Sequence, residues 1–325
     1  MVEKVKLKLL YSDIKPELDM IEKELEQAVD SESPLLNDAS LHLLQAGGKR
    51  IRPVFVLLAG KFGNYNIDVM KRVAVPLELI HMASLVHDDV IDDSELRRGK
   101  PTVKAEWNNS VAMYTGDFIL ARALEYITEI EDPKLHQILS KTMIEVCRGE
   151  IIQIEDKYKL DQNLRDYLRR IKRKTALLIS SSCELGALVS GADLKTAAHL
   201  RRFGYFIGMS FQIIDDILDF TSSDEELGKP AGSDFIQGNM TLPVLCARKD
   251  REIYELLKNN LQKEISDEER LNIVKTIRNS PAIDEAKKIS EKYLEKALAE
   301  LACLPKSSAS KTMRKIAFFI GKRKF

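Results

Sequence analysis

The chain has 325 residues, of which 44% are hydrophobic and 31% charged, and its 50 basic side chains balance 50 acidic ones. This globular composition, with only 15 glycines and 10 prolines, disfavours collagen-like, low-complexity and turn-dense all-β chains. A net charge of zero argues against nucleic acid as the main partner.

The spacing of the cysteines and the length of the hydrophobic stretches indicate in which cellular compartment the protein works. The four cysteines form no CxxC pair, so the sequence indicates neither a zinc site nor a disulfide framework. No stretch approaches the roughly 18 uninterrupted apolar residues of a membrane span, and charges interrupt the first segment, MVEKVKLKLLYSD, too often for a signal peptide. We expect a cytoplasmic protein that touches a membrane at most peripherally.

Apolar residues recur at three and four positions almost throughout, which predicts helices along nearly the whole chain. In chain order, the expected breaks fall at Ser33 and Pro34, Gly47 and Gly48, Gly99 to Pro101, Asp132 and Pro133, Gly191, Ser222 to Gly238, and Ser280 and Pro281. No long linker separates two halves of different composition. The sequence therefore predicts an all-α fold, with residues 1–325 forming one large helical domain.

An acidic run, HDDVIDD, ends the helix that is expected to contain ELIHMASLV. Winding this helix at 100° per residue places Asp88 and Asp92 on the same narrow face as Ser84 and His81, while Met82 and other apolar side chains cover the opposite side. Two carboxylates, one turn apart, are therefore predicted to share a face.

A second acidic run, FQIIDDILDF, lies inside a strongly apolar segment. The same construction groups Gln212, Asp215 and Asp219, with Asp216 at the edge. A solvated helix face is the simpler interpretation of either run. Like charges at i and i+4 destabilise a helix, however, and carboxylates buried among apolar residues are costly unless cations bind them. The repeated pattern therefore predicts that these carboxylates face an interior cavity and bind cations.

The ligand chemistry of the two runs narrows the choice of cation. Carboxylates without His or Cys partners select hard ions, Mg²⁺ or Mn²⁺, over zinc. Mg²⁺ usually shares itself between one or two carboxylates and a phosphate, so two DDxxD runs indicate a clamp for a diphosphate. A calcium buffer is the rival interpretation, but EF-hand ligands follow a loop with a central glycine, and neither run does.

Basic segments accompany both acidic runs and are candidates for binding an anion, although each could be a surface patch. The candidates are Lys49, Arg50 and Arg52 in GGKRIRP, Arg97, Arg98 and Lys100 in LRRGKP, Lys174 with Thr175 at the end of RRIKRKT, and Lys229 in GKPAGSD.

Together with GDFILARA and TLPV, these segments resemble the trans-prenyltransferases, or polyprenyl diphosphate synthases, in family order over about residues 40–250. The resemblance implies a single helical bundle of the isoprenoid synthase type around a deep central cavity. It also implies dependence on two or three Mg²⁺ ions, or on Mn²⁺, and successive condensation of isopentenyl diphosphate with an allylic diphosphate. Within the family, the motifs most resemble those of the catalytic large subunits of heptaprenyl diphosphate synthases.

The resemblance assigns roles by position. Asp88, Asp92 and Asp215 would ligate magnesium on the allylic diphosphate, and Asp89, Asp216 and Asp219 would orient metal-bound water or add ligation. Arg97, Lys174, Thr175, Gln212 and Lys229 resemble contacts to the allylic diphosphate, with Lys174 also among the catalytic residues. Lys49, Arg52, His81 and Arg98 resemble contacts to isopentenyl diphosphate, although a buried structural histidine is the alternative at position 81. Asn239 replaces a frequent family lysine, which puts a further diphosphate contact there in doubt.

Product length in the family depends on the residues four and five positions before the first motif, here Ser84 and Ala83. Both are small, so the resemblance implies a product longer than geranylgeranyl, with heptaprenyl first. Helix geometry favours Ser84, which lies directly below Asp88, over Ala83, which points away. Hexaprenyl to nonaprenyl and geranylgeranyl products remain alternatives.

The resemblance implies a dimer, formed either with a second copy or with a small regulatory subunit of unrelated sequence. Two other functions stay open. A terpene cyclase usually replaces the second DDxxD motif and lacks the GGKRIRP site, whereas a non-catalytic partner subunit would carry decayed acidic motifs.

Overall fold

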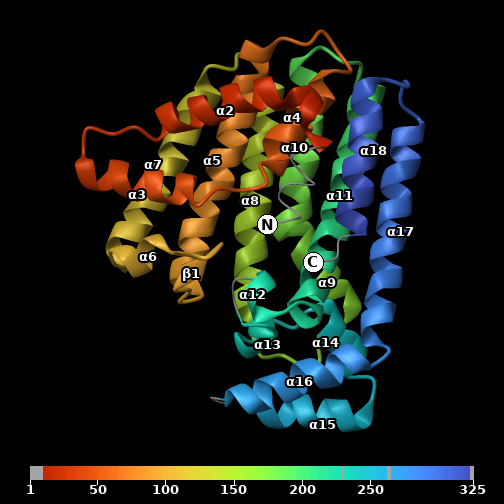
Figure 1. The fold of residues 1–325 in the computed structure, drawn as a ribbon. Helices are drawn as coiled ribbons and strands as arrows, with labels where there is room; N and C mark the ends of the chain where they lie inside the picture. The colour runs from red at the N-terminus through yellow and green to blue at the C-terminus, as the bar shows by residue number, and fades with distance from the viewer. Residues whose placement is uncertain (1–9, 228–229, 262–264, 323–325) are drawn as a thin grey trace. The chain divides into compact units, whose positions relative to one another are not determined.

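The computed structural model describes residues 10–227, 230–261 and 265–322 (Figure 1). Helices make up nearly all of its regular structure, which confirms the predicted all-α fold class. Among these residues the exception is an antiparallel ribbon of two strands, β1 (Leu96–Arg97) and β2 (Lys100–Pro101). The two residues between the strands, Arg98 and Gly99, both have positive φ, as a two-residue type I′ hairpin turn requires. The break expected near Gly99 is therefore a hairpin.

Contacts divide the described chain into two compact units. Unit 1 contains the described residues up to Lys141 together with Ile179–Gly204 and Glu300–Ile316, and unit 2 contains Thr142–Leu178, Tyr205–Ala299 and the described residues from Ala317. Every boundary between the units falls inside a helix rather than in a linker. The helices concerned are α8 (Pro133–Asp156), α10 (Leu177–Val189), α11 (Leu194–Thr221), α17 (Ala282–Ala302) and α18 (Ser308–Gly321).

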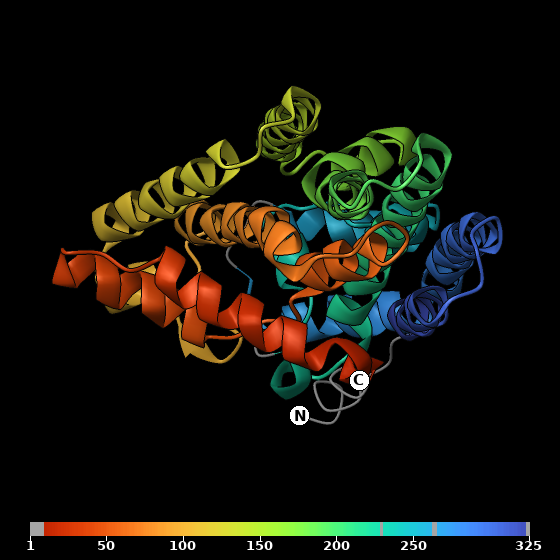
Figure 2. The ribbon, with the colours of Figure 1, turned by 90° about the horizontal axis from the view of Figure 1, so that it is seen from above.

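Most elements of unit 1 come from the first 130 residues. They are η1 (Ser12–Ile14), α2 (Lys15–Ala28), α3 (Pro34–Gln45), α4 (Ile51–Gly60), α5 (Ile67–Ile91), α6 (Val103–Glu106) and α7 (Asn109–Thr128). Helix α5 contacts α2, α4 and α7, and Figures 1 and 2 show it running beside them. Helix α4 is buried almost all round, as its continuous apolar sequence predicts.

Helices α5 and α7 approach closely because a glycine faces the contact. A Cβ atom at Gly116 of α7 would lie 2.3 Å from Nε2 of His87 on α5, which is closer than atoms can come. His87 Nε2 also lies 3.3 Å from the Asp117 carboxylate. This contact fixes the position of the last turns of α5, which carry the first acidic motif.

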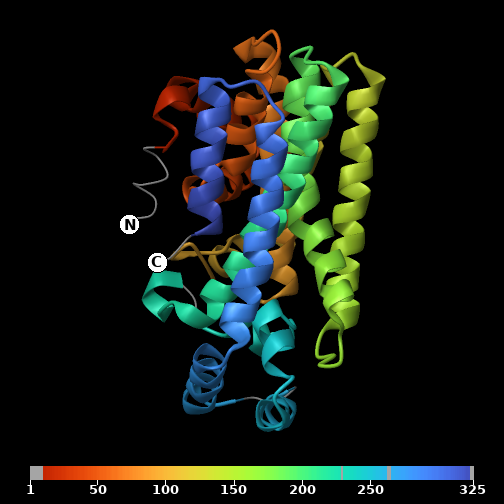
Figure 3. The same cartoon turned by 90° about the vertical axis from the view of Figure 1, so that its right-hand side faces the viewer.

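Unit 2 contains the remaining elements: α9 (Leu164–Ile171), the π-helical turn η2 (Lys172–Ala176), α12 (Asp224–Leu227), α13 (Ser233–Ile236), α14 (Leu242–Ala247), α15 (Arg251–Asn260) and α16 (Asp267–Asn279). Its core includes the buried side chains of Tyr167, Phe220 and Phe235. Figure 3 shows α15 and α16 side by side, in agreement with their contacts.

Within the described part of the chain, no helix combines the length and the hydropathy that crossing a membrane requires.

Candidate active site

The first acidic motif occupies the end of α5. Asp88 and Asp92 are half-buried, and the backbone N–H of Asp92 donates to the Asp88 carbonyl at 2.8 Å, so the two residues are one turn apart. Asp89 is only 2% exposed. Asp93 is exposed and forms an ion pair with Lys104. The end of α5 therefore presents two accessible carboxylates and buries a third.

Arg97, in strand β1, holds the buried carboxylate. Its Nε lies 2.8 and 2.9 Å from the two Asp89 oxygens, and its Nη2 donates to Oδ1 at 2.6 Å. Burial raises the pKa of Asp89, and the Arg97 guanidinium opposes that shift. Asp89 thus fixes Arg97, predicted as an allylic-diphosphate contact, beside the first motif.

Three of the four residues predicted to contact isopentenyl diphosphate lie near one another in unit 1. Burial lowers the pKa of Arg52 to about 10, with Glu78 opposing this shift and Arg98 adding to it. Burial also lowers the pKa of His81 well below its ordinary value, and the nearby guanidinium groups of Arg52 and Arg98 lower it further. Lys49, the fourth residue, is half-buried in the loop before α4. Crowded cations of this kind suit a polyanionic ligand.

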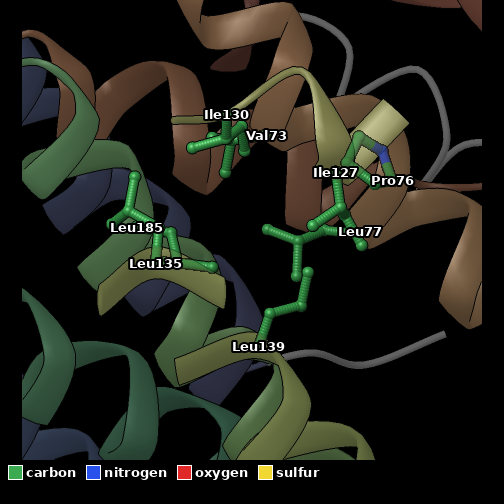
Figure 4. A pocket seen from close by; sticks show the side chains of 8 residues that line it. All are labelled: Val73, Pro76, Leu77, Ile127, Ile130, Leu135, Leu139 and Leu185. Atoms are coloured by element: carbon green, nitrogen blue, oxygen red, sulfur yellow. The ribbon is translucent and has the colours of Figure 1, made fainter. Parts of the chain in front are cut away.

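The same face of α5 continues below the carboxylates. Ser84 is half-buried, with its hydroxyl donating to the His81 carbonyl at 2.8 Å, and Ala83 is 2% exposed. Leu77, three turns below Asp88, points into a small apolar pocket of about 10 Å³, where it approaches Leu139 (Figure 4). The pocket is lined by Val73, Pro76, Leu77, Ile127, Ile130, Leu135, Leu139 and Leu185. Since a water molecule needs about this much space and several polar partners, this apolar pocket is expected to be dry.

The second acidic motif, on α11, was expected to turn its carboxylates toward an interior cavity. Asp216 and Asp219 are buried, at 3% and 1% exposure, whereas Asp215 is exposed. Neighbouring residues of a helix point about 100° apart, which explains why Asp215 and Asp216 differ so strongly. The Ser233 hydroxyl donates to Asp219 Oδ1 at 3.3 Å.

A chain of hydrogen bonds fixes the middle carboxylate of this motif. The Tyr167 hydroxyl donates to Asp216 Oδ2 at 2.6 Å, and Gln212 Nε2 donates to Oδ1 at 2.9 Å. The Thr175 hydroxyl donates in turn to Gln212 Oε1 at 2.6 Å. Burial raises the pKa of Asp216 to about 7, with Asp234 adding to the shift and the two donors opposing it. The structure thus brings together Thr175 and Gln212, two predicted allylic contacts.

Lys174 and Thr175 lie on the π-helical turn η2, an irregularity that is frequent at functional sites. Lys174 Nζ forms an ion pair with Glu150 at 2.9 Å. A Cβ atom at Gly149 would come within 3.1 Å of the Lys174 backbone nitrogen, so α8 approaches this turn closely. The predicted catalytic lysine is therefore held against an acid of α8.

The segment after α12 contains Lys229 and Asn239, which the sequence analysis singled out. Lys229, a predicted allylic-diphosphate contact, lies outside the described residues. Asn239 is half-buried, and its backbone N–H donates to the Asp234 carbonyl at 2.8 Å.

Sequence reasoning missed two residues that support these sites. Glu78 is the one acid in the apolar run VPLELIHMASLV, a signal that could have drawn attention to it. Tyr167 stands in the basic segment before η2 and gave no such signal, because only its burial against Asp216 distinguishes it.

The donor set fits a cation that is shared with a ligand. Among the described residues, no three His, Cys, Asp or Glu side chains form a group that could hold a metal ion by themselves. Accessible carboxylates nonetheless lie at the end of α5 and on α11, and hard divalent cations bind one or two carboxylates together with phosphate oxygens. Carboxylates on α5 and on α11, together with the clustered cations of unit 1, are residue types that a diphosphate-binding enzyme uses.

Comparisons with known proteins identify the class. The model of the polyprenyl synthetase family matches residues 33–277. The chain is 59% identical over 324 residues to heptaprenyl diphosphate synthase component 2 of Bacillus subtilis, covering 100% of this chain and 93% of that protein. The chain therefore belongs to the polyprenyl synthetase family and is a prenyltransferase.

Solved structures agree with this assignment. The crystal structure of heptaprenyl diphosphate synthase from Staphylococcus aureus is 44% identical with a TM-score of 0.92, covering 96% of this chain and 99% of that one. A polyprenyl synthase from Caulobacter crescentus, solved in complex with calcium and isoprenyl diphosphate, is 31% identical with a TM-score of 0.94, covering 98% of each chain. The fold of this chain is thus that of the polyprenyl synthases, as predicted.

Proposed function

We propose that this chain condenses isopentenyl diphosphate units onto farnesyl or geranylgeranyl diphosphate and so makes heptaprenyl diphosphate, the precursor of a menaquinone side chain. The names of the relatives with 59% and 44% identity support this product. One observation carries the chemistry: each acidic motif keeps its first carboxylate accessible, while protein donors hold its second carboxylate.

The proposed ion is Mg²⁺, two or three per active site, with Asp88, Asp92 and Asp215 as its protein ligands. The divalent ion neutralises charge on the leaving diphosphate when bound. Calcium and a diphosphate together in the Caulobacter structure support a divalent ion beside a diphosphate. Asp89, Asp216 and Asp219, all buried, position the motifs from behind.

The side chains then have separate tasks. Arg97, Lys174, Thr175, Gln212 and Lys229 orient the allylic diphosphate, while Lys49, Arg52, His81 and Arg98 hold isopentenyl diphosphate. The allylic C–O bond breaks, the alkene of isopentenyl diphosphate attacks the resulting cation, and the proton that is lost passes to the departing diphosphate. The apolar faces of the two helices, opposite their acidic faces, keep water from that cation. A protein nucleophile is not required.

Product length follows from the depth available below Asp88. Ser84 leaves room one turn down, His81 follows two turns down on the same face, and Leu77, three turns down, lines the small apolar pocket. Replacing Ser84 by Phe is expected to shorten the product, whereas Ala83, which points away, should matter less. An unchanged product distribution in the Ser84→Phe variant would place the floor elsewhere.

The setting of the enzyme is also part of the proposal. The name "component 2" of the Bacillus protein implies a second subunit there, which supports a heterodimer with a small regulatory subunit; a homodimer is the alternative. We propose a single catalytic domain, residues 1–325, located in the cytoplasm with at most peripheral membrane contact.

One assay tests the function. Purified chain is incubated with labelled isopentenyl diphosphate, farnesyl diphosphate and Mg²⁺, with and without a small subunit from a heptaprenyl synthase, and the dephosphorylated products are sized. Heptaprenyl alcohol is the expected product. Another product length would overturn the heptaprenyl assignment, and inactivity under both conditions would contradict the catalytic role.

A further inference from the structure

Glu78 is a buried acid in the middle of α5. Its side chain is 3% exposed. Oε1 accepts a hydrogen bond from Arg50 Nη1 at 3.2 Å, while Oε2 has no hydrogen-bond partner among the described residues. A buried carboxylate with a free oxygen is costly unless positive charge surrounds it.

The guanidinium group that binds Glu78 has a second one close to it. A Cβ atom at Gly48 would lie 3.0 Å from Arg98 Nη1 and 3.1 Å from Arg50 Nη1, so the groups of Arg50 and Arg98 both reach the same backbone position. Arg52 Nε is buried and also has no hydrogen-bond partner among the described residues. The absence of a side chain at Gly48 allows this close approach.

Electrostatics link these cations to Glu78. Burial lowers the pKa of both Arg52 and Arg98, and in each case Glu78 is the group that most opposes the shift. Arg50 and Arg98 act on each other as like charges. Without Glu78, the cluster would consist mainly of mutually repelling cations.

A second acid, Glu22 of α2, also binds Arg50 but is more exposed than Glu78. It binds Arg50 through Nε at 2.5 Å and Nη2 at 3.1 Å, but its side chain is 40% exposed. Glu22 therefore binds Arg50 from the more exposed side, whereas Glu78 is buried and acts electrostatically on all three arginines.

We infer that Glu78 is a positioning residue for isopentenyl diphosphate. Its carboxylate holds Arg50 directly and keeps Arg52 and Arg98 together, while leaving Arg52 with a donor that is not taken up by the protein. The inference rests on the proposed function, which places isopentenyl diphosphate at Arg52 and Arg98. Glu78 touches neither substrate and acts through the arginines.

The test compares Glu78→Gln with Glu22→Gln, which removes the matched acid from the outer side of Arg50. Losing a charged partner is expected to weaken isopentenyl diphosphate binding about tenfold in Glu78→Gln, measured by calorimetry without allylic substrate, and to raise its KM similarly. The KM of the allylic diphosphate should stay close to wild type, whereas the Tm should fall, because the buried guanidinium groups lose their carboxylate. Glu22→Gln should change isopentenyl diphosphate binding far less.

An Arg52→Gln variant separates failure of the proposed isopentenyl diphosphate site from failure of the inference about Glu78. If Arg52→Gln leaves isopentenyl diphosphate binding intact, the proposed site itself is wrong. If Arg52→Gln weakens binding but Glu78→Gln does not, the site stands and the inference about Glu78 falls. Equal rises in both KM values would show a merely structural role.

Two further variants complete the experiment. If Glu78→Gln does not fold, Glu78→Asp is tested in its place, because it keeps the charge on a side chain that is one methylene shorter. An intermediate loss of isopentenyl diphosphate binding is expected for Glu78→Asp. Binding like that of wild type would contradict the inference. In the Arg52→Gln background, Glu78→Gln should have a smaller effect than it has alone, since both act on one binding event. Full additivity of the two effects would overturn the proposed coupling.

Discussion

The two acidic motifs share one sequence pattern but are supported by different chemistry. On α5, a charged donor, Arg97, holds the buried Asp89. On α11, two neutral donors, Tyr167 and Gln212, hold the buried Asp216. Burial raises the pKa of both carboxylates, and the donors oppose it in both. In both motifs the second aspartate is held in place, by a cation on α5 and by a pair of neutral donors on α11.

Both motifs also lie toward the C-terminal ends of their helices. The partial negative charge of a helix C-terminus disfavours carboxylates by about 0.3–1 kcal/mol each. Acids retained at such positions, twice in one chain, are expected to serve cation binding rather than stability.

The largest effect should come from the accessible carboxylates. Asp88→Ala and Asp215→Ala are each expected to lower turnover about a thousandfold or more, because each removes charge that acts on the leaving group. Circular dichroism should show that the fold is retained in both. Full activity of either variant would contradict the assignment of the replaced aspartate as a metal ligand. It would also show that the two motifs differ in their role in catalysis.

Removing the charged support is the next change. Arg97→Gln leaves Asp89 buried without its cation, so the free energy of unfolding should fall by about 2–3 kcal/mol. Urea denaturation in the presence of a chelator measures this. An unchanged stability would show that the Asp89–Arg97 pair does not hold the end of α5.

Removing one neutral donor should cost less. Tyr167→Phe leaves Gln212 on Asp216, and a loss of about 1 kcal/mol in unfolding free energy is expected. The Mg²⁺ concentration for half-maximal activity should rise, and Mn²⁺ binding measured by electron paramagnetic resonance should weaken with it. Tyr254→Phe, elsewhere in unit 2, is the control. Metal binding like that of wild type would limit Tyr167 to a packing role.

A change of pH alters stability without altering the sequence, through the basic site. Because His81 has a depressed pKa in the fold, the unfolded chain takes up a proton below about pH 6.5 that the folded chain does not. Folding stability should therefore fall with pH below that value, by at most about 1.4 kcal/mol per unit from this residue. Urea denaturation at pH 7.5 and 5.5 should show a flatter dependence for His81→Asn. Identical slopes would contradict a neutral His81 in the folded chain.

Much of the fold and the site was predictable. The three-to-four spacing of apolar residues predicted the helices, and DDxxD with GGKRIRP indicated the family, because these signals are local. The β1–β2 hairpin escaped prediction, since it depends on positive φ at Arg98, a residue type that rarely adopts it. Burial was misjudged at Asp215, which is exposed although its surrounding sequence is apolar.

By itself, the sequence determined the helical class, the two acidic motifs and the basic residues that accompany them. Only the tertiary structure decided which groups fix these residues: Arg50 meets acids 28 positions away on either side, and Tyr167 meets Asp216 across 49 positions. A helical repeat gives the direction of a side chain from its own axis, but the partner in that direction depends on how distant helices pack.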